Sequence, residues 1–200
     1  MIETQQVTAV ILAGGKGTRF NGTDKGLMTF NGQPLIQNIL TNIATQVDYI
    51  LINANRNLQT YKNLGFPLIQ DSLDDFQGPL AGFAAAMQNA RTEYVITLPC
   101  DGPFIPHDYV RRMILAQHTE NTELTVAHDG KRLQPVHALL SVNLLDSLMA
   151  FLENGDRKPG LWYANHRMAL ADFSDQPEAF QNINTPAEHQ RLQAAERPDP

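Results

Sequence analysis

Three short apolar runs, at residues 7–12, 49–52 and 94–98, dominate the hydrophobic pattern of the chain. Each run is rich in β-branched residues and lacks regular polar alternation. This pattern is typical of parallel strands whose two faces are both covered by helices. Three weaker strands are predicted at residues 66–69, 124–127 and 136–140.

Side chains at helical spacing lie between and after these runs. They form four stripes, which consist of Ile36, Ile39, Leu40, Ile43 and Val47, of Leu80, Phe83, Ala84 and Met87, of Val110, Met113, Ile114 and Gln117, and of Leu144, Leu145, Leu148 and Leu152. A capping box with proline at the first helical position, Thr185-Pro186-Ala187-Glu188, predicts a last helix. The alternation from Val7 to Gln117 predicts an α/β fold, a single Rossmann-like, doubly wound and mainly parallel sheet with helices on both faces.

Length and composition fit one globular domain. The chain has 200 residues, and we assign residues 1–196 to this domain and residues 197–200 to a frayed tail. A net charge of −6 argues against a nucleic-acid partner, which needs a basic surface, but not against small anionic ligands. Cys100 is the only cysteine, and the first apolar run is too short to span a membrane. We therefore expect a cytoplasmic protein without a membrane partner.

A glycine-rich segment, Leu-Ala-Gly-Gly-Lys-Gly-Thr-Arg from Leu12 to Arg19, follows the first predicted strand. Glycines let backbone amides approach a phosphate, and Lys16, Arg19 and Lys25 add positive charge. The spacing of glycines matches neither a P-loop nor the dinucleotide fingerprint. The alternative is a plain glycine turn with solvated charges.

Polar residues also follow the other predicted strands. Asp101 comes directly after Leu98-Pro99-Cys100, where a carboxylate suits Mg²⁺, although it could instead cap the next turn. Asn53 and Asp71 fall on the same edge and suit a base or ribose, or else they cap loops. Residues 78–82 open a helix whose amides could face an anion. Cys100 is more simply explained by packing than as a nucleophile.

Together these motifs resemble the nucleotidyltransferase family with the Leu-Ala-Gly-Gly-x-Gly-Thr-Arg signature, and within it the molybdenum cofactor guanylyltransferases. The resemblance extends to about the helix at Thr185. Its landmarks are Leu12 to Arg19, Asp24-Lys25-Gly26, Asn53-Ala54-Asn55-Arg56, Asp71-Ser72, Gly78-Pro79-Leu80-Ala81-Gly82, Pro99-Cys100-Asp101 and Asn182-Ile183-Asn184-Thr185-Pro186.

The resemblance implies transfer of GMP from GTP to molybdenum-molybdopterin with release of pyrophosphate. It implies that the N-terminal part binds GTP through Leu12, Ala13, Gly14, Gly15, Lys25, Asn53, Asp71 and Asp101. It implies catalytic roles for Arg19, Lys25 and Asp101, with Mg²⁺ as cofactor and Asp101 as its ligand. Cytidylyl relatives have alanine where this chain has Gly14, so one hypothesis is that the missing Cβ makes room for a purine.

The acceptor side is carried by the C-terminal part in this family. The resemblance implies acceptor contacts from Gln134, Arg157, Lys158, Asn182 and Asn184. Arg157 and Lys158 stand where the family often has two arginines, and the alternative for them is a solvated loop after a helix. For Asn182 and Asn184 the alternative is a structural turn before the capped helix. The resemblance also leaves room for a protein that delivers or receives the cofactor. The rival functions are a sugar-1-phosphate nucleotidyltransferase and a non-catalytic nucleotide-binding module.

Overall fold

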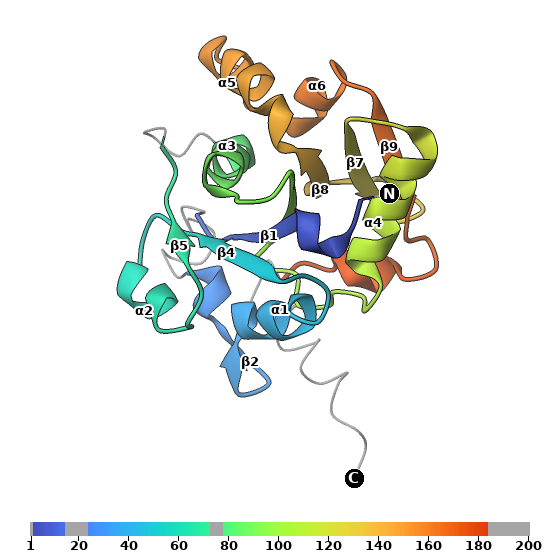
Figure 1. Cartoon of the computed structure of the whole chain (residues 1–200). Coiled ribbons are helices and arrows are strands. Elements are labelled where there is room, and N and C mark those ends of the chain that lie inside the picture. Colours follow the sequence, from blue (N-terminus) through green and yellow to red (C-terminus); the bar gives the residue numbers. More distant parts are fainter. Residues whose placement is uncertain (1, 15–23, 73–77, 184–200) are drawn as a thin grey trace.

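The computed structural model describes residues 2–14, 24–72 and 78–183. Within these ranges a seven-stranded sheet with the order β5-β4-β1-β6-β8-β7-β9 carries helices on both faces (Figure 1). Its strands are β1 (Val7–Leu12), β4 (Tyr49–Asn53), β5 (Leu68–Ile69), β6 (Tyr94–Pro99), β7 (Leu124–His128), β8 (Leu133–Ser141) and β9 (Met168–Asp172). A separate hairpin pairs β2 (Thr29–Phe30) with β3 (Gln33–Pro34).

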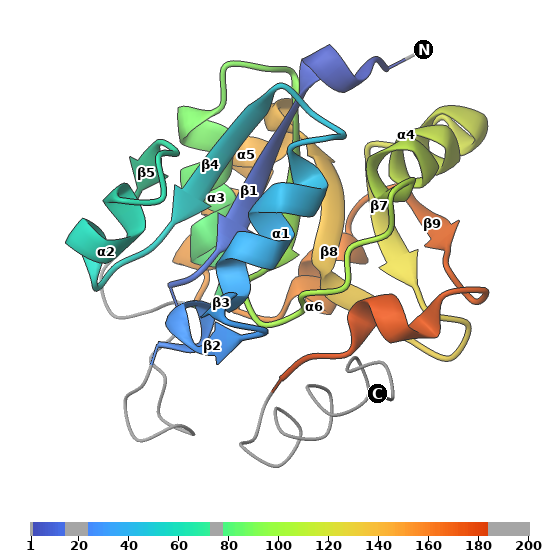
Figure 2. The ribbon, with the colours of Figure 1, turned by 90° about the horizontal axis from the view of Figure 1, so that it is seen from below.

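The helices are α1 (Leu35–Ile43), α2 (Leu58–Lys62), α3 (Pro79–Asn89), α4 (Tyr109–Glu120), α5 (Leu145–Glu153) and α6 (Pro159–Tyr163). Short 3-10 turns are η1 (Thr4–Gln6), η3 (Lys25–Leu27), η4 (Val142–Leu144) and η5 (Pro177–Phe180). Seen from below, α1 and α4 cross in front of the strands and α3 and α5 lie behind them (Figure 2). No helix in the described ranges combines the length and the apolar composition that a membrane crossing requires.

The sheet is mainly parallel, as the sequence predicts. β1 pairs in parallel with β4 and β6, β4 with β5, and β7 with β9, whereas β8 is antiparallel to β6 and β7. The exception follows from the short connection between β7 and β8, since parallel neighbours would need a long crossover. Asp129 closes this connection, because its Oδ1 accepts 2.8 Å hydrogen bonds from the backbone N–H groups of Lys131 and Arg132.

Two hydrophobic cores sandwich the sheet. Val10 of β1 belongs to the core that contains side chains of α3, α5 and α6, while its neighbour Ile11 belongs to the core that contains side chains of α1 and α4. Successive side chains of a strand point to opposite faces, so a strand that is buried on both faces is mostly apolar; the buried Thr8 of β1 has its hydroxyl within 2.7 Å of that of Thr92. Burying an Ile or Val side chain completely contributes about 1.5–3 kcal/mol. The central position of β1 is therefore strongly specified.

Several elements differ from the sequence prediction. The strand expected at 66–69 contains only Leu68–Ile69, and Leu144 belongs to η4 rather than to the following helix. β9 escapes detection because it is a short edge strand with two alanines, and α2 and α6 are too short for a helical period. The predicted capping box at residues 185–188 and the tail at 197–200 lie outside the described residues.

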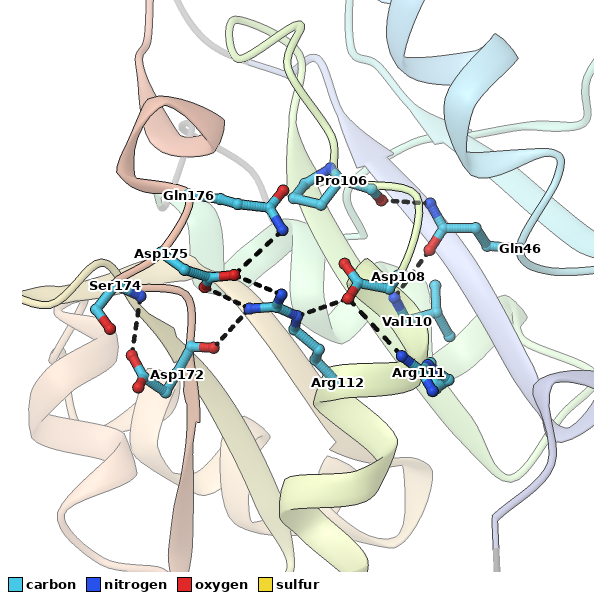
Figure 3. A network of polar contacts seen from close by, with 10 residues as sticks. All are labelled: Gln46, Pro106, Asp108, Val110, Arg111, Arg112, Asp172, Ser174, Asp175 and Gln176. Carbon is cyan, nitrogen blue, oxygen red and sulfur yellow. Dashed lines mark hydrogen bonds and ion pairs between the residues drawn. The ribbon is translucent and has the colours of Figure 1, made fainter.

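An arginine network fastens α4 to the segment that follows β9 (Figure 3). Arg112 donates to both carboxylate oxygens of Asp175, at 2.6 and 2.7 Å, and its Nε donates to Asp108 Oδ2 at 2.8 Å. Its third contact is the backbone carbonyl of Asp172 at 3.2 Å, and its guanidinium lies 5.1 Å from the ring centroid of Phe173. Hydrogen bonding to Arg112 lowers the pKa of the Asp175 carboxyl to about 2, so the pair stays ionised at neutral pH.

A buried aromatic cluster lies between β8 and η5. The ring of His137, which is 3% exposed, is centred 4.9 Å from that of Phe180 and 5.8 Å from that of Tyr109. The hydroxyl of Tyr109 lies 3.1 Å from His137 Nδ1. Burial lowers the pKa of His137 to about 3, because the imidazolium would lose its hydration.

His137 should make folding stability depend on pH. In the unfolded chain the His137 imidazole is protonated with a pKa near 6.5, whereas in the folded chain it is protonated only near pH 3. The free energy of unfolding is therefore highest above pH 6.5 and falls as the pH drops below that value. Between pH 7.5 and 5 this linkage should cost about 2 kcal/mol. Between pH 7.5 and 5, the free energy of unfolding of His137→Gln, measured with denaturant, should fall by about 2 kcal/mol less than that of wild type. The exposed-site variant His118→Gln should keep the wild-type loss, and a wild-type loss in His137→Gln would contradict the assignment.

Candidate functional site

A cavity of about 400 Å³ opens at the carboxyl ends of β1, β4 and β6. It is lined by Leu12, Gly14, Asn53, Asp71, Gly78, Pro79, Gly82, Pro99, Asp101 and Val136. The chain passes from β1 to β4 on one side and later to β6 on the other, so the strand order reverses at β1. Open α/β sheets bind ligands at such a reversal. The cavity therefore lies where the fold favours a ligand.

Backbone hydrogen bonds align the three strand ends. Leu12 stands opposite Asn53 on one side and Pro99 on the other. The pairing continues past the strands, because Ala13 N–H donates to the Asn53 carbonyl at 2.8 Å and Cys100 N–H donates to the Leu12 carbonyl at 3.2 Å. The predicted residues Leu12, Ala13 and Asn53 are thus brought together by the sheet itself.

Two asparagine side chains hold the carboxylate of Asp71. Asn53 Nδ2 donates to Asp71 Oδ1 at 2.9 Å, and Asn55 Nδ2 donates to Asp71 Oδ2 at 2.7 Å. Asn55 Oδ1 also accepts the backbone N–H of Asp71 at 2.9 Å. The sequence analysis assigned no role to Asn55. The available signal was its spacing, since residues i and i+2 of an extended segment share a side, and Ala54 between them is buried.

Lys25 and Asp101, which are both predicted site residues, form an ion pair. Lys25 Nζ lies 3.0 Å from Asp101 Oδ2, and the two side chains are 20% and 16% exposed. Asp101 also belongs to the cavity lining, and its carbonyl accepts the backbone N–H of Ile183 at 2.8 Å. A carboxylate and an ammonium group are therefore available together at the end of β6.

Asp24 anchors the segment that presents Lys25. Its carboxylate is nearly buried and accepts hydrogen bonds from Tyr61 OH at 2.6 Å and from Asn57 Nδ2 at 3.0 Å, and Arg56 Nε lies 3.6 Å away. The sequence places Asp24 in the motif Asp24-Lys25-Gly26 but predicts no role for it. A buried carboxylate needs hydrogen-bond partners of this kind. Asp24 therefore connects η3 to α2 and fixes the position of the neighbouring Lys25.

Cys100 packs between this segment and the end of β6. A Cβ on Gly26 would lie 3.2 Å from Cys100 Cβ and 2.8 Å from Tyr61 OH, so only glycine fits there without movement. Burial raises the pKa of the Cys100 thiol, and the nearby carboxylates of Asp101 and Asp24 raise it further. The reactive thiolate is therefore disfavoured, which agrees with a packing role.

Asn182 lies close to Asp101, the predicted metal ligand. Its Oδ1 would be 3.2 Å from a Cβ placed on Gly102, the residue after Asp101. This oxygen is buried and accepts no hydrogen bond from the part of the chain that the structure describes. The arginine network and the aromatic cluster hold the segment that leads to Asn182, so distant packing supports this corner of the site.

The other predicted acceptor residues that the structure describes are not part of the cavity lining. Gln134 is buried, and its Nε2 donates to Asp129 Oδ2 at 2.7 Å. Arg157 Nη1 donates to the carbonyls of Leu152 and Asp156, while the exposed Lys158 precedes α6. The loop is nevertheless close to the cavity, because the Arg157 carbonyl would be 3.9 Å from a Cβ on Gly78, a lining residue.

Some predicted residues cannot be placed. Gly15, Lys16, Gly17, Arg19 and Asn184 lie outside the described residues, and their roles stay predictions. Within the described ranges, no three His, Cys, Asp or Glu side chains converge on a common point. Mg²⁺ does not require such a cluster, because it binds through one or two carboxylates together with water and phosphate oxygens.

Comparison with known proteins gives a consistent assignment. Residues 9–169 match the model of the MobA-like NTP transferase domain. The chain is 49% identical over 190 residues to the molybdenum cofactor guanylyltransferase of Shewanella sediminis, covering 95% of this chain and 97% of that protein.

Solved structures show the same architecture. Molybdopterin-guanine dinucleotide biosynthesis protein A from Archaeoglobus fulgidus has a TM-score of 0.77 at 18% identity, covering 94% of this chain and 97% of that one. A 4-diphosphocytidyl-2C-methyl-D-erythritol synthase from Anaerococcus prevotii has a TM-score of 0.75 at 11% identity, with 96% of each chain covered. At these identities the likeness concerns the fold alone.

The sequence matches are more specific than the fold. The family model covers well over half of the chain, and the Shewanella protein matches it almost from end to end. Both matches include the strand ends that line the cavity. The chain is a nucleotidyltransferase and belongs to the family of MobA-like NTP transferases.

Proposed function

We propose that this protein transfers GMP from GTP to molybdenum-molybdopterin and releases pyrophosphate. The relative from Shewanella sediminis carries the name of this activity. The observation that carries the proposal is the cavity at the reversal of strand order, which has the amide-held Asp71 and the Lys25-paired Asp101 in its lining. The Asp71 carboxylate suits the guanine base of GTP, and the Asp101 carboxylate suits the phosphates with their metal ion.

Asp71 fits the edge of guanine. An ionised carboxylate only accepts hydrogen bonds and has about four acceptor positions. Asn53 and Asn55 each use one position, one on each oxygen, which leaves an acceptor on both oxygens. Guanine offers two adjacent donors, N1–H and the 2-amino group, whereas cytosine and adenine have an acceptor at the corresponding ring nitrogen. Asp71 should therefore favour GTP over CTP and ATP.

The triphosphate would lie between the glycine segment and the end of β6. In this proposal Lys25 and Arg19 offset the charge of the phosphates, and amides after Leu12 align them. Asp101 would hold Mg²⁺, and this ion would supply positive charge to the phosphates and to the reacting phosphorus. The partly buried carboxylate in the cavity lining fits this ion, because Mg²⁺ needs few protein ligands and keeps positions for water and phosphate.

The chemical step is an in-line displacement. An oxygen of the acceptor phosphate attacks the α-phosphorus of GTP, the bond between this phosphorus and the bridging oxygen breaks, and pyrophosphate leaves with the electron pair. An ionised phosphate needs little help from a base, so the protein contributes alignment and charge. The raised pKa of Cys100 argues against a covalent intermediate on its thiol. Gln134, Arg157, Lys158, Asn182 and Asn184 would serve the acceptor side, Asn182 from beside Gly102.

Pyrophosphate release tests the function directly. Wild-type protein with Mg²⁺ should release pyrophosphate only when GTP and molybdenum-loaded molybdopterin are both present, with CTP and ATP much slower. Release that requires a sugar 1-phosphate instead would establish the rival transferase. Binding of GTP without release in the presence of any of these acceptors would indicate a non-catalytic nucleotide-binding module.

The paired residues should affect different steps. Asp101→Asn should lower kcat by more than a hundredfold and change the Kd for GTP far less, because the metal acts mainly on the reacting phosphorus. Lys25→Met should raise the Kd for GTP by tenfold to a hundredfold, the effect of losing about 1.5–3 kcal/mol from a charged hydrogen bond. Titration calorimetry and steady-state kinetics separate the two, with the exposed Lys62→Met as control. Wild-type turnover in Asp101→Asn would exclude the metal role.

A further inference from the structure

The side-chain amides of Asn53 and Asn55, which donate to the Asp71 carboxylate, lie against two glycines, Gly14 and Gly82. A Cβ on Gly14 would lie 2.9 Å from Asn55 Nδ2 and 3.4 Å from Asn53 Oδ1. A Cβ on Gly82 of α3 would lie 2.8 Å from Leu12 Cδ2 and 2.9 Å from Asn53 Oδ1. Contacts below 3.0 Å force one group to move, so a methyl group at either position would displace an amide that holds Asp71.

Asn55 is not one of the residues that line the cavity. The lining contains Gly14, Asn53 and Asp71, but Asn55 is absent from it among the described residues. Asn55 holds Asp71 at two points, because its Nδ2 donates to the carboxylate at 2.7 Å and its Oδ1 accepts the backbone N–H at 2.9 Å. The side chain and the backbone of Asp71 are therefore both fixed by one residue that lies outside the cavity lining.

The geometry points to Asn55 as a positioning residue for guanine recognition, and to Gly14 as a residue that selects guanine through Asn55. This inference rests on the proposed function. It differs from the sequence-based hypothesis that Gly14 makes room for a purine ring. The nearest neighbour of a Cβ at Gly14 is the Asn55 amide, so an alanine there would push this amide away and turn the Asp71 carboxylate from the base.

Backbone strain does not compete with this explanation. The φ angle of Gly14 lies outside the left-handed region, so alanine can adopt its backbone conformation. Any loss of guanine selectivity in Gly14→Ala must then come from contacts of the added methyl group with neighbouring side chains, chiefly with Asn55. Removing the Asn55 amide should remove most of that cost, which makes the two positions non-additive.

A double-mutant cycle read with GTP and ITP tests the inference, since ITP lacks only the 2-amino group. Wild type should bind GTP more tightly than ITP by about tenfold to a hundredfold, as for a hydrogen bond to a carboxylate. Gly14→Ala and Asn55→Ala should each reduce this ratio to within about threefold of unity and raise KM for GTP more than they lower kcat. Gly14→Ala should have little further effect in the Asn55→Ala background.

The control pair uses Asn63, an exposed asparagine at the C-terminal cap of α2, and Gly14→Ala should keep its full effect in the Asn63→Ala background. If Gly14→Ala lowers the GTP/ITP ratio by the same factor with and without the Asn55 amide, the methyl group acts on the base directly and the inference is wrong. A wild-type GTP/ITP ratio in Asn55→Ala would also overturn it. Asn55→Ser replaces Asn55→Ala if the latter loses its thermal transition. Failure of wild type to prefer GTP over CTP would instead contradict the proposed function.

Discussion

The backbone register of β1 with β4 and β6 decides where the polar groups of the site stand. Leu12 faces Asn53 and Pro99, and hydrogen bonds at Ala13 and Cys100 carry this alignment past the strand ends. A shift by one residue would exchange the two faces of β1, and the residues on both faces are buried as far as Ile11. The two cores therefore fix the register, and the register fixes the site.

Within this frame, two carboxylates are held in different ways. Neutral amides hold Asp71, so its orientation is fixed while its charge and part of its acceptor capacity remain. An ammonium group pairs with Asp101, so that its charge is balanced where a metal ion and phosphates would enter. Local partners of this kind explain how a chain of net charge −6 can offer a site to an anionic nucleotide. A 4-diphosphocytidyl-2C-methyl-D-erythritol synthase has the same fold, so the fold alone does not decide which nucleotide binds.

The sequence predicts the central strands and the shared edge well, because continuous apolar runs and the polar residues after them are local signals. It predicts neither the direction of β8 nor the strand β9, which depend on connection length and on neighbours far along the chain. The pairings Lys25–Asp101 and Asn55–Asp71 join residues 76 and 16 positions apart, so they become visible only after folding. Asp24 was missed for the same reason, since its partners come from α2 and the segment before it.

The central claim is that the ends of β1, β4 and β6 bind GTP with its base at Asp71 and its phosphates at Lys25 and Asp101. A crystal structure with Mg²⁺ and a GTP analogue that has a methylene group between the α- and β-phosphorus atoms tests this most directly. The account predicts hydrogen bonds from guanine N1–H and its 2-amino group to Asp71, with the triphosphate beside Lys25. A nucleotide bound outside this cavity, or in the reverse orientation with its phosphates at Asp71, would contradict it.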